Sequence, residues 1–225
     1  MNAPLPRTAP VLLFDLDGTL ADSAPDLAGA ANDMRQARGL APLPLAAFRP
    51  HGGSGARGML GCAFGCAPGQ DGYDAMREEF VHLYERQILR HTRLFDAVPA
   101  LLDALDARQL PWGIVTNKAM HLAEPLVTGL GLWPRARVLV AGDTTPHSKP
   151  HPAPLQEAAR RLDVPAQRCL YVGDDLRDMQ AARSAGMGAL AAAWGYLGPG
   201  ADPHTWLADA VLEDPGALLQ FLELA

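Results

Sequence analysis

Short apolar runs that recur along the chain, with helix-like segments between them, constrain the fold more than any other feature of this sequence. The runs are Val11–Leu16, Trp112–Thr116, Val138–Ala141, Cys169–Gly173, Ala189–Ala193 and the weaker Ala210–Leu212. Continuous runs of this kind are typical of strands that are buried on both faces of a parallel sheet. Apolar residues at helical spacing fill the segments Pro99–Arg108, Leu122–Leu130, Pro154–Leu162 and Leu176–Ala185. The alternation predicts an α/β fold with a doubly wound, parallel, Rossmann-like sheet.

One long stretch interrupts this alternation. Between residues 21 and 91 we find no strand pattern, whereas two amphipathic helices are predicted at Pro25–Arg38 and Asp71–Arg90. Because the stretch directly follows the first predicted strand, it is expected to lie over the strand ends. We therefore predict three parts: a loose N-terminal arm at 1–10, a Rossmann-like core formed by 11–20 and 92–225, and an inserted α-helical cap domain at 21–91.

Composition and charge narrow the classes of partner. The chain has 225 residues, 48% of them hydrophobic, and a formal net charge of −6 without any basic block. This balance argues against nucleic acid and against an anionic membrane surface as partners, and no apolar run reaches the roughly 18 residues of a membrane span. The three cysteines form no C-x-x-C pair, which fits a reducing compartment. We expect a cytoplasmic monomer or dimer that acts on a small molecule.

Polar residues gather where the predicted strands end. The four groups are Asp15-Leu16-Asp17-Gly18-Thr19, Thr116-Asn117-Lys118, Ser148-Lys149-Pro150 and Gly173-Asp174-Asp175 followed by Asp178. In an open parallel sheet the carboxyl ends of the strands meet at one edge, where ligands bind. We therefore expect several carboxylates and a lysine ammonium at a single site.

Carboxylates that are so close repel one another, and they remain ionised together when a cation lies between them. Oxygen donors without clustered histidine or cysteine favour Mg²⁺ over zinc, and Mg²⁺ usually keeps water and phosphate oxygens among its ligands. The sequence therefore predicts Mg²⁺ as the cofactor. Taken singly, each group also has an ordinary interpretation, such as loop or helix capping. The occurrence of all four groups in this order, each near a predicted strand end, favours a shared functional site over these ordinary interpretations.

The same four groups, in this order and with a helical insert after the first, resemble the four-motif signature of the haloacid dehalogenase superfamily. The resemblance extends from residue 11 to about residue 221. Within the superfamily the chain is similar to the phosphoglycolate phosphatase group, notably in Val115-Thr116-Asn117-Lys118 and in the length of the cap. This resemblance implies a Mg²⁺-dependent phosphatase that hydrolyses a small phosphomonoester through an aspartyl-phosphate intermediate.

A narrower likeness concerns the substrate. The segments Trp112–Lys118, Gly173–Asp178 and Trp194-Gly195-Tyr196 resemble those of bacterial N-acetylmuramic acid 6-phosphate phosphatases. The leading substrates are therefore 2-phosphoglycolate and N-acetylmuramic acid 6-phosphate. Three alternatives remain open at this stage: a haloacid dehalogenase, a sugar phosphomutase and a binding protein that keeps the fold without catalysis. The second acid, Asp17, argues against a dehalogenase.

The resemblance also implies roles for the acids. Asp15 is expected to be the nucleophile that takes up the phosphoryl group. Asp17 is expected to protonate the leaving alcohol and then to activate water, with its main-chain carbonyl on the metal. Asp15 and Asp174 are the expected side-chain ligands of Mg²⁺, and Asp178 is expected to contribute through water.

The remaining candidates are expected to hold the substrate. Thr116, Asn117 and Lys149 are expected to bind the transferring phosphoryl oxygens, with Lys149 offsetting their negative charge. The main chain at Leu16 and Gly18 is expected to approach the phosphate closely.

A glycine-rich segment of the predicted cap, Pro50–Gly58, has two interpretations. Its backbone can fold over the ligand, with Arg57 or His51 recognising a carboxylate or a sugar hydroxyl. Alternatively it is a flexible turn between two helices.

Overall fold

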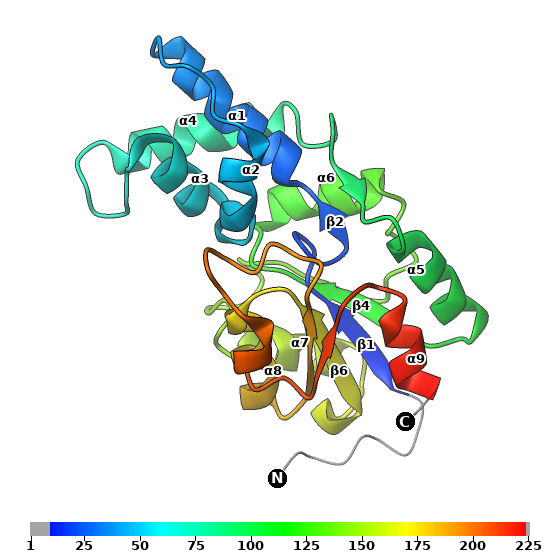
Figure 1. The fold of residues 1–225 in the computed structure, drawn as a ribbon. Coiled ribbons are helices and arrows are strands. Elements are labelled where there is room, and N and C mark those ends of the chain that lie inside the picture. Colours follow the sequence, from blue (N-terminus) through cyan, green and yellow to red (C-terminus); the bar gives the residue numbers. More distant parts are fainter. Residues whose placement is uncertain (1–9, 224–225) are drawn as a thin grey trace.

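The computed structural model describes residues 10–223, and a six-stranded sheet forms its centre (Figure 1). The strands are β1 (Val11–Phe14), β4 (Trp112–Val115), β5 (Leu139–Val140), β6 (Cys169–Gly173), β7 (Gly188–Ala192) and β8 (Ala210–Leu212). They are ordered β5-β4-β1-β6-β7-β8, and every neighbouring pair is parallel. The predicted parallel sheet is confirmed.

Helices cover both faces of this sheet because alternate strand residues point to opposite faces. On β1, Leu12 and Phe14 pack into one apolar cluster, whereas Val11 and Leu13 pack into another. The first cluster lies under α5 (Val98–Ala107), α6 (Met120–Gly129) and α9 (Ala217–Glu223). The second lies under α7 (Ala153–Arg161) and α8 (Leu176–Ala185). The doubly wound arrangement is therefore confirmed.

The strand order determines where a ligand can bind. From β1 the chain builds outward through β4 and β5 on one side, and then returns to place β6 on the other side of β1. Phe14 at the end of β1 pairs with both Ile114 and Val172. The residues that follow β1, β4 and β6 therefore meet at the point where the strand order reverses, which is the usual ligand site of an open α/β sheet.

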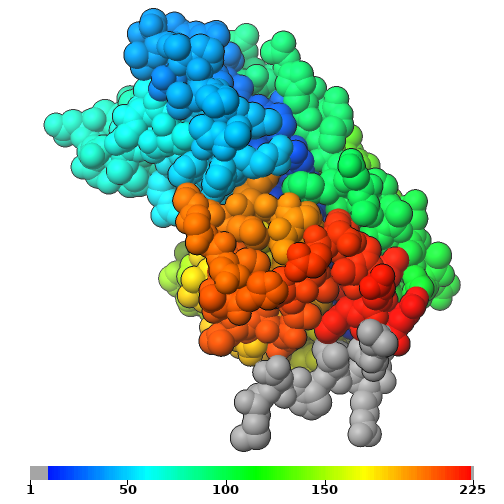
Figure 2. Space-filling view, in the orientation of Figure 1, coloured from blue at the N-terminus to red at the C-terminus, as the bar shows by residue number. Residues whose placement is uncertain are grey.

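Four helices and a short 3₁₀ segment lie between residues 24 and 85, after β1 and before α5. They are α1 (Ala24–Ala37), α2 (Leu45–Phe48), the 3₁₀ helix η1 (Arg49–Ser54), α3 (Gly55–Phe64) and α4 (Tyr73–Glu85), and we call residues 24–85 the inserted helices. Figure 2 shows them, in blue and cyan, resting on the orange segment that follows β7. Two further 3₁₀ turns lie outside them, η2 (Ala166–Arg168) and η3 (Pro203–Thr205).

The inserted helices differ from the prediction in three details. Helix α4 begins at Tyr73 because Gly72 adopts a left-handed φ of +79°, and it ends at Glu85. The segment Pro50–Gly58 is mostly helical, so its interpretation as a flexible turn is wrong. The expectation that no strand lies between 21 and 91 is also wrong.

A small ribbon of two strands, each two residues long, connects the inserted helices to the rest of the fold. β2 (Ala21–Asp22) pairs antiparallel with β3 (Arg93–Leu94), so the outgoing and returning linkers run side by side. Strands of this length show no alternation that sequence reading can detect. The division into a core and a cap domain stays a prediction, and the predicted arm at 1–10 lies outside the described residues except for Pro10.

Among residues 10–223, no helix combines the length and the apolar character needed to cross a bilayer.

Two glycines differ in the space that surrounds them, and alanine substitutions at both therefore test the packing. A Cβ on Gly113 in β4 would overlap the Val138 side chain and lie 3.0 Å from its carbonyl oxygen, whereas a Cβ on Gly61 in α3 would meet nothing closer than 4.0 Å. We expect Gly113→Ala to lower the free energy of unfolding by about 1–3 kcal/mol through overpacking. Gly61→Ala should raise it by about 0.5–1 kcal/mol through helix propensity. Urea denaturation measures both, and equal effects would contradict this packing.

Candidate active site

Three carboxylates meet at the carboxyl edge of the sheet. Asp15 follows β1, Asp174 follows β6, and Asp178 lies in the first turn of α8. One oxygen of each lies within 4.8 Å of an oxygen of the other two, so the three can share a metal ion. We call them the acid cluster. Asp178 is therefore a candidate ligand of such an ion, and its predicted contact through water stays a prediction.

Asp174 is held in a buried position by two donors. The Thr19 hydroxyl donates to its Oδ1 at 2.9 Å, and the Tyr196 amide donates to its Oδ2 at 2.8 Å. A Cβ on Gly18 or Gly195 would overlap the Asp174 side chain, so only glycine lets the chain pass this close. Burial, with Asp15 and Asp178 nearby, raises the pKa of Asp174 well above its ordinary value.

Lys149 supplies the compensating charge. Its Nζ lies 3.0 Å from Asp15 Oδ1 and 2.8 Å from Asp178 Oδ1, and its side chain is only 2% exposed. Burial would lower the pKa of Lys149, but the two carboxylates raise it above its ordinary value. The pKa of Asp15 is about 6 because burial raises it and Lys149 only partly offsets that rise. Buried Lys149 and partly exposed Asp15 thus form a charge-assisted pair.

The backbone of Lys149 is clamped by Asn117. The Asn117 Nδ2 donates to the Lys149 carbonyl, and the Lys149 amide donates to Asn117 Oδ1, both at 2.9 Å. The Asn117 side chain therefore positions Lys149, and its expected contact with the phosphoryl group stays a prediction. The Lys149 ammonium also donates to Tyr171 Oη at 2.7 Å, which supports it from β6.

Asp17 lies apart from the acid cluster. Its carboxylate accepts two hydrogen bonds from the Lys118 ammonium, at 2.9 and 3.0 Å, and one from Ser23 Oγ at 2.5 Å. Its side chain is therefore not among the three carboxylates that can share a metal ion. The expectation that the main-chain carbonyl of Asp17 binds the metal stays a prediction.

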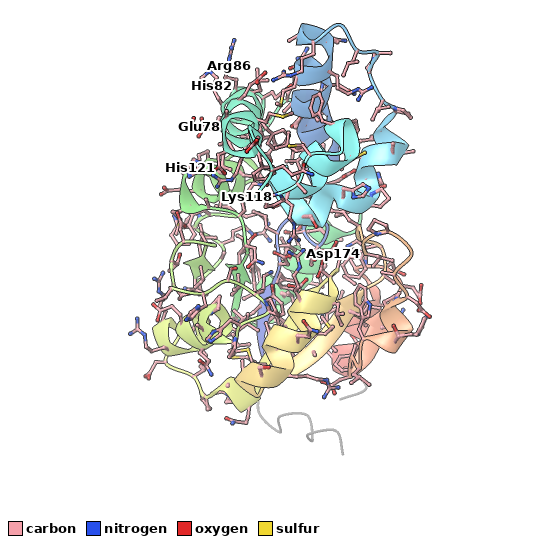
Figure 3. The ribbon with its side chains drawn as sticks, turned by 90° about the vertical axis from the view of Figure 1, so that its left-hand side faces the viewer. Glu78, His82, Arg86, Lys118, His121 and Asp174 are labelled. Carbon is pink, nitrogen blue, oxygen red and sulfur yellow. The ribbon has the colours of Figure 1, made fainter. Side chains whose placement is uncertain are left out.

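Lys118 is a site residue that the sequence reading placed at a strand end without assigning it a role. Its side chain is 7% exposed, and its Nζ lies 4.8 Å from the centre of the Tyr84 ring on α4. Figure 3 shows Lys118 where the inserted helices face the sheet, above Asp174. Its place directly after Thr116 and Asn117 indicated that it belongs to the site, but its ion pair with Asp17 had no signal in the sequence.

The backbone donors near Asp15 have partners within the chain. The Leu16 amide donates to Asp15 Oδ1 at 2.7 Å, and the Gly18 amide donates to the Ala21 carbonyl at 2.9 Å. Gly18 also makes room for Asp174, and the expected approach of the main chain at Leu16 and Gly18 to a phosphate stays a prediction. The Thr116 hydroxyl accepts from the Lys118 amide at 3.1 Å, which leaves its own proton to donate.

A cavity of about 800 Å³ lies between the inserted helices and the sheet edge. Asp15, Asp17, Thr116 and Lys149 form its floor, whereas Arg57 of α3 lines it from the opposite side. Its remaining polar wall comes mainly from α4 and α6, through Arg77, Glu78, His82, Glu85 and His121. The candidate catalytic residues and Arg57 thus border one cavity.

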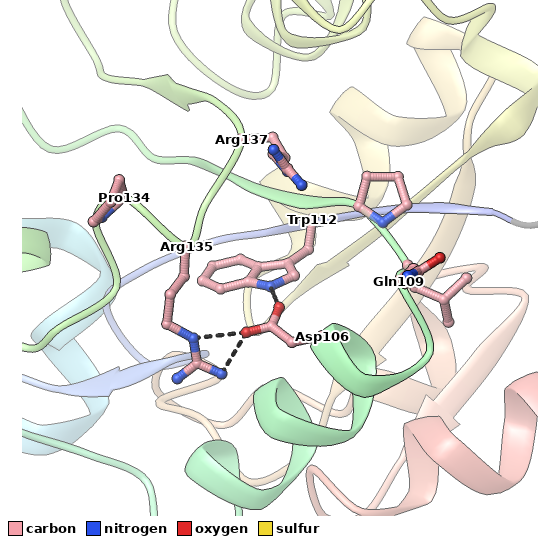
Figure 4. Close-up of a pocket in the computed structure, with 8 residues that line it drawn as sticks. Asp106, Gln109, Trp112, Pro134, Arg135 and Arg137 are labelled. Carbon is pink, nitrogen blue, oxygen red and sulfur yellow. Dashed lines mark hydrogen bonds and ion pairs between the residues drawn. The ribbon is translucent and has the colours of Figure 1, made fainter.

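A second cavity, of about 510 Å³, lies at the opposite end of the sheet, where β4 begins (Figure 4). Asp106 there accepts from the Trp112 indole and from Arg135, both at 2.8 Å. These polar groups already satisfy one another, and the acid cluster lies beyond the other end of the strands. The chemistry therefore belongs to the first cavity.

Comparisons with known proteins agree with this geometry. The family model described as haloacid dehalogenase-like hydrolase matches residues 12–192. A phosphoglycolate phosphatase from Xanthomonas campestris is 45% identical over 207 residues, covering 92% of this chain and 93% of that protein. An N-acetylmuramic acid 6-phosphate phosphatase from Pseudomonas aeruginosa is 39% identical over 214 residues, covering 95% of each. The crystal structure of a predicted phosphoglycolate phosphatase from Haemophilus somnus has a TM-score of 0.83 at 26% identity, covering 96% of this chain and 99% of that one.

The chain belongs to the haloacid dehalogenase-like hydrolase family. Within that family it is a phosphatase that hydrolyses phosphomonoesters. The predicted enzyme class is therefore confirmed, in preference to the dehalogenase, phosphomutase and non-catalytic alternatives.

The pair of hydrogen bonds between Asn117 and the Lys149 backbone has a matched counterpart in the inserted helices. Asn32 makes the same pair of 2.9 Å hydrogen bonds with the backbone of Leu43. We expect Asn117→Ala to lower phosphatase kcat by about tenfold or more, because Lys149 loses its support. Asn32→Ala should cost similar stability, about 1 kcal/mol or more, yet keep kcat within about twofold. Parallel kinetics and thermal unfolding of the two variants test this, and equal losses of kcat would contradict it.

Proposed function

We propose that this phosphatase is Mg²⁺-dependent and transfers the phosphoryl group of a small phosphomonoester first to Asp15 and then to water. One observation carries the proposal: the carboxylate of Asp15 lies 3.0 Å from the Lys149 ammonium and is itself a member of the acid cluster, which can hold a metal ion. A carboxylate in that position can act as a nucleophile while positive charge faces the incoming phosphoryl group.

The donor set fits Mg²⁺. Asp15, Asp174 and Asp178 offer hard carboxylate oxygens, the ligands that this ion prefers. When bound, Mg²⁺ would offset the charge of these carboxylates and of the phosphoryl oxygens. The raised pKa values of Asp15 and Asp174 support the assignment, because they show that these acids are costly to ionise together without a cation.

Two displacements at phosphorus complete the proposed reaction. In the first, an oxygen of Asp15 attacks phosphorus, the ester P–O bond breaks, and Asp17 gives a proton to the leaving alcohol. In the second, Asp17 takes a proton from water, the water oxygen attacks phosphorus, and the bond to Asp15 breaks. Lys149 and Thr116 line the cavity in which the phosphoryl oxygens would lie. Lys118 and Ser23 keep Asp17 out of the acid cluster.

The substrate we propose is a phosphomonoester that also bears a carboxylate. The two relatives are named for phosphoglycolate and N-acetylmuramic acid 6-phosphate, and both compounds carry one. The exposed Arg57 lines the cavity opposite the catalytic residues and is suited to bind that group. A cavity of about 800 Å³ exceeds the needs of a two-carbon acid and favours the sugar phosphate. Side-by-side kcat/KM values on the two compounds test this choice.

Replacement of the nucleophile should abolish turnover. We expect Asp15→Asn to lower kcat by about 10³-fold or more, since an amide cannot form the intermediate. Its thermal unfolding should remain close to that of the wild type. Asp163→Asn, an exposed substitution away from the cavity, serves as the control and should keep full activity. Near-normal hydrolysis by Asp15→Asn would exclude the proposed nucleophile.

Binding of Mg²⁺ should depend on pH. In the metal-free folded protein the pKa of Asp15 is about 6, above its ordinary value of 3.8. The free energy of unfolding of the metal-free protein therefore falls as the pH rises from about 4 to above 6, because Asp15 loses its proton more readily in the unfolded chain. Mg²⁺ requires the ionised carboxylates. The rise in Tm caused by Mg²⁺, relative to EDTA, should therefore be larger near pH 8 than near pH 5. Equal shifts at the two pH values would argue against binding at these acids.

Arg57 should matter only for substrates that bear a carboxylate. We expect Arg57→Ala to raise KM for the preferred substrate by about tenfold through loss of a charge-assisted hydrogen bond, and to leave p-nitrophenyl phosphate hydrolysis within about twofold. Arg86, just beyond α4 and outside the cavity lining, supplies the control Arg86→Ala. If Arg57→Ala impaired both substrates alike, recognition of the carboxylate by Arg57 would be ruled out.

A further inference from the structure

We propose that Tyr196 is a positioning residue that couples the inserted helices to the acid cluster, and that Trp194-Gly195-Tyr196 forms the clamp through which it acts. No step of the proposed reaction uses this segment. It follows β7 and lies below the inserted helices (Figure 2). The clamp contacts the acid cluster on one side and both linkers of the inserted helices on the other.

The first side of the clamp fixes Asp174. The Tyr196 amide donates to Asp174 Oδ2 at 2.8 Å, while the Trp194 indole donates to the carbonyl of Thr19 at 3.0 Å. The Thr19 hydroxyl in turn donates to Asp174 Oδ1 at 2.9 Å. A Cβ on Gly195 would overlap Asp174 and lie 2.6 Å from the Gly18 carbonyl oxygen. The segment is therefore packed so closely against Asp174 that position 195 has no room for a side chain.

The second side holds the start of α1. The Tyr196 hydroxyl accepts hydrogen bonds from the amides of Ser23 and Ala24, both at 2.8 Å, and donates to Asp22 Oδ1 at 3.1 Å. The side chain of Ser23 makes no capping bond to its own helix, so the phenol takes over part of that task. One oxygen of the core thus holds the first turn of the inserted helices.

The ring of Tyr196 contacts the insert at two further places. A Cβ on Gly52 in η1 would lie 2.5 Å from the ring, and Phe95, just after β3 on the returning linker, lies 6.5 Å from it between centroids. Arg49 of η1 stacks over the same ring at 5.9 Å and pairs with both oxygens of Asp22, at 3.0 and 2.9 Å. Tyr196 therefore contacts both linkers and η1.

A single residue that holds Asp174 by its amide and α1 by its hydroxyl fixes the inserted helices relative to the acid cluster. The two contacts use different atoms, so a substitution can separate them. Tyr196→Phe removes the hydroxyl bonds to the linker but keeps the amide bond to Asp174 and the ring packing. The kinetic part of this inference rests on the proposed function, because it assumes that the cavity wall contacts the substrate.

The structural test uses hydrogen exchange in the metal-free, full-length protein. In Tyr196→Phe, amide exchange in the first turn of α1, residues 23–28, should be about tenfold faster than in the wild type, whereas exchange in β6 should be unchanged. This readout needs neither metal nor substrate, so it remains valid if the proposed reaction is wrong. Unchanged exchange in the first turn of α1 would overturn the proposal.

The kinetic test asks which constants move. In Tyr196→Phe, KM for the preferred substrate should rise by about tenfold with a smaller change in kcat, because the wall that carries Arg57 is no longer held in place. The Mg²⁺ concentration that gives half-maximal activity should stay within about twofold, because the amide bond to Asp174 persists. A parallel loss of kcat and Mg²⁺ affinity would overturn the coupling and indicate a general loss of loop structure.

A matched pair of arginine variants provides the independent check. Arg49 makes a bidentate ion pair with Asp22 at the linker. Arg38 makes the same kind of pair with Glu79, but within the inserted helices. Arg49→Met should reproduce the faster exchange at residues 23–28 and the higher KM, while Arg38→Met should leave both within about twofold of the wild type. Equal effects of the two variants would overturn the proposal.

Discussion

Repulsion among three carboxylates at one sheet edge is the constraint on which the rest of this structure depends. Asp15, Asp174 and Asp178 have oxygens within 4.8 Å of one another in a largely buried place. Such an arrangement is costly unless positive charge is supplied. Lys149 supplies one charge within the chain, and the proposed Mg²⁺ supplies the rest. The raised pKa values of Asp15 and Asp174 express the part of this cost that Lys149 does not offset.

Much of the surrounding structure keeps that charge distribution in place. Asn117 clamps the backbone of Lys149, and glycines at 18 and 195 let the chain pass close to Asp174. Lys118 and Ser23 hold Asp17 out of the acid cluster, so that this carboxylate has its own charged partner. The second acid is therefore kept separate from the three that can share a cation, as the division between a nucleophile and a general acid requires.

Sequence reading could predict the parallel sheet and the place of the acid cluster, because both follow from short-range patterns. A strand buried on both faces is apolar throughout, and the polar residue at its end is the next residue along the chain. The same reading did not predict the hydrogen bonds of Asn117 with Lys149, 32 residues away, or the ion pair of Lys118 with Asp17, 101 residues away. Hydrogen bonds between residues so far apart depend on tertiary packing, and no local pattern encodes them.

The inserted helices show the same limit. Their amphipathic faces predicted α1 and α4, whereas the helical conformation of Pro50–Gly58 and the two-residue ribbon at the linkers were not anticipated. Glycine and proline usually indicate a loop, but here the packing of Gly52 against the Tyr196 ring leaves no room for a larger residue and favours the compact 3₁₀ turn. The segment that determines this packing, Trp194-Gly195-Tyr196, lies far away in the sequence.

The central claim, that Asp15 takes up the phosphoryl group beside a shared cation, is tested most directly by trapping the enzyme in its first turnover. Acid quench during hydrolysis with Mg²⁺, followed by peptide mass spectrometry, should find a phosphorylated peptide with the modification on Asp15, and omission of Mg²⁺ should abolish it. Rapid first-turnover release of the alcohol with the phosphate carried by another residue would contradict the account.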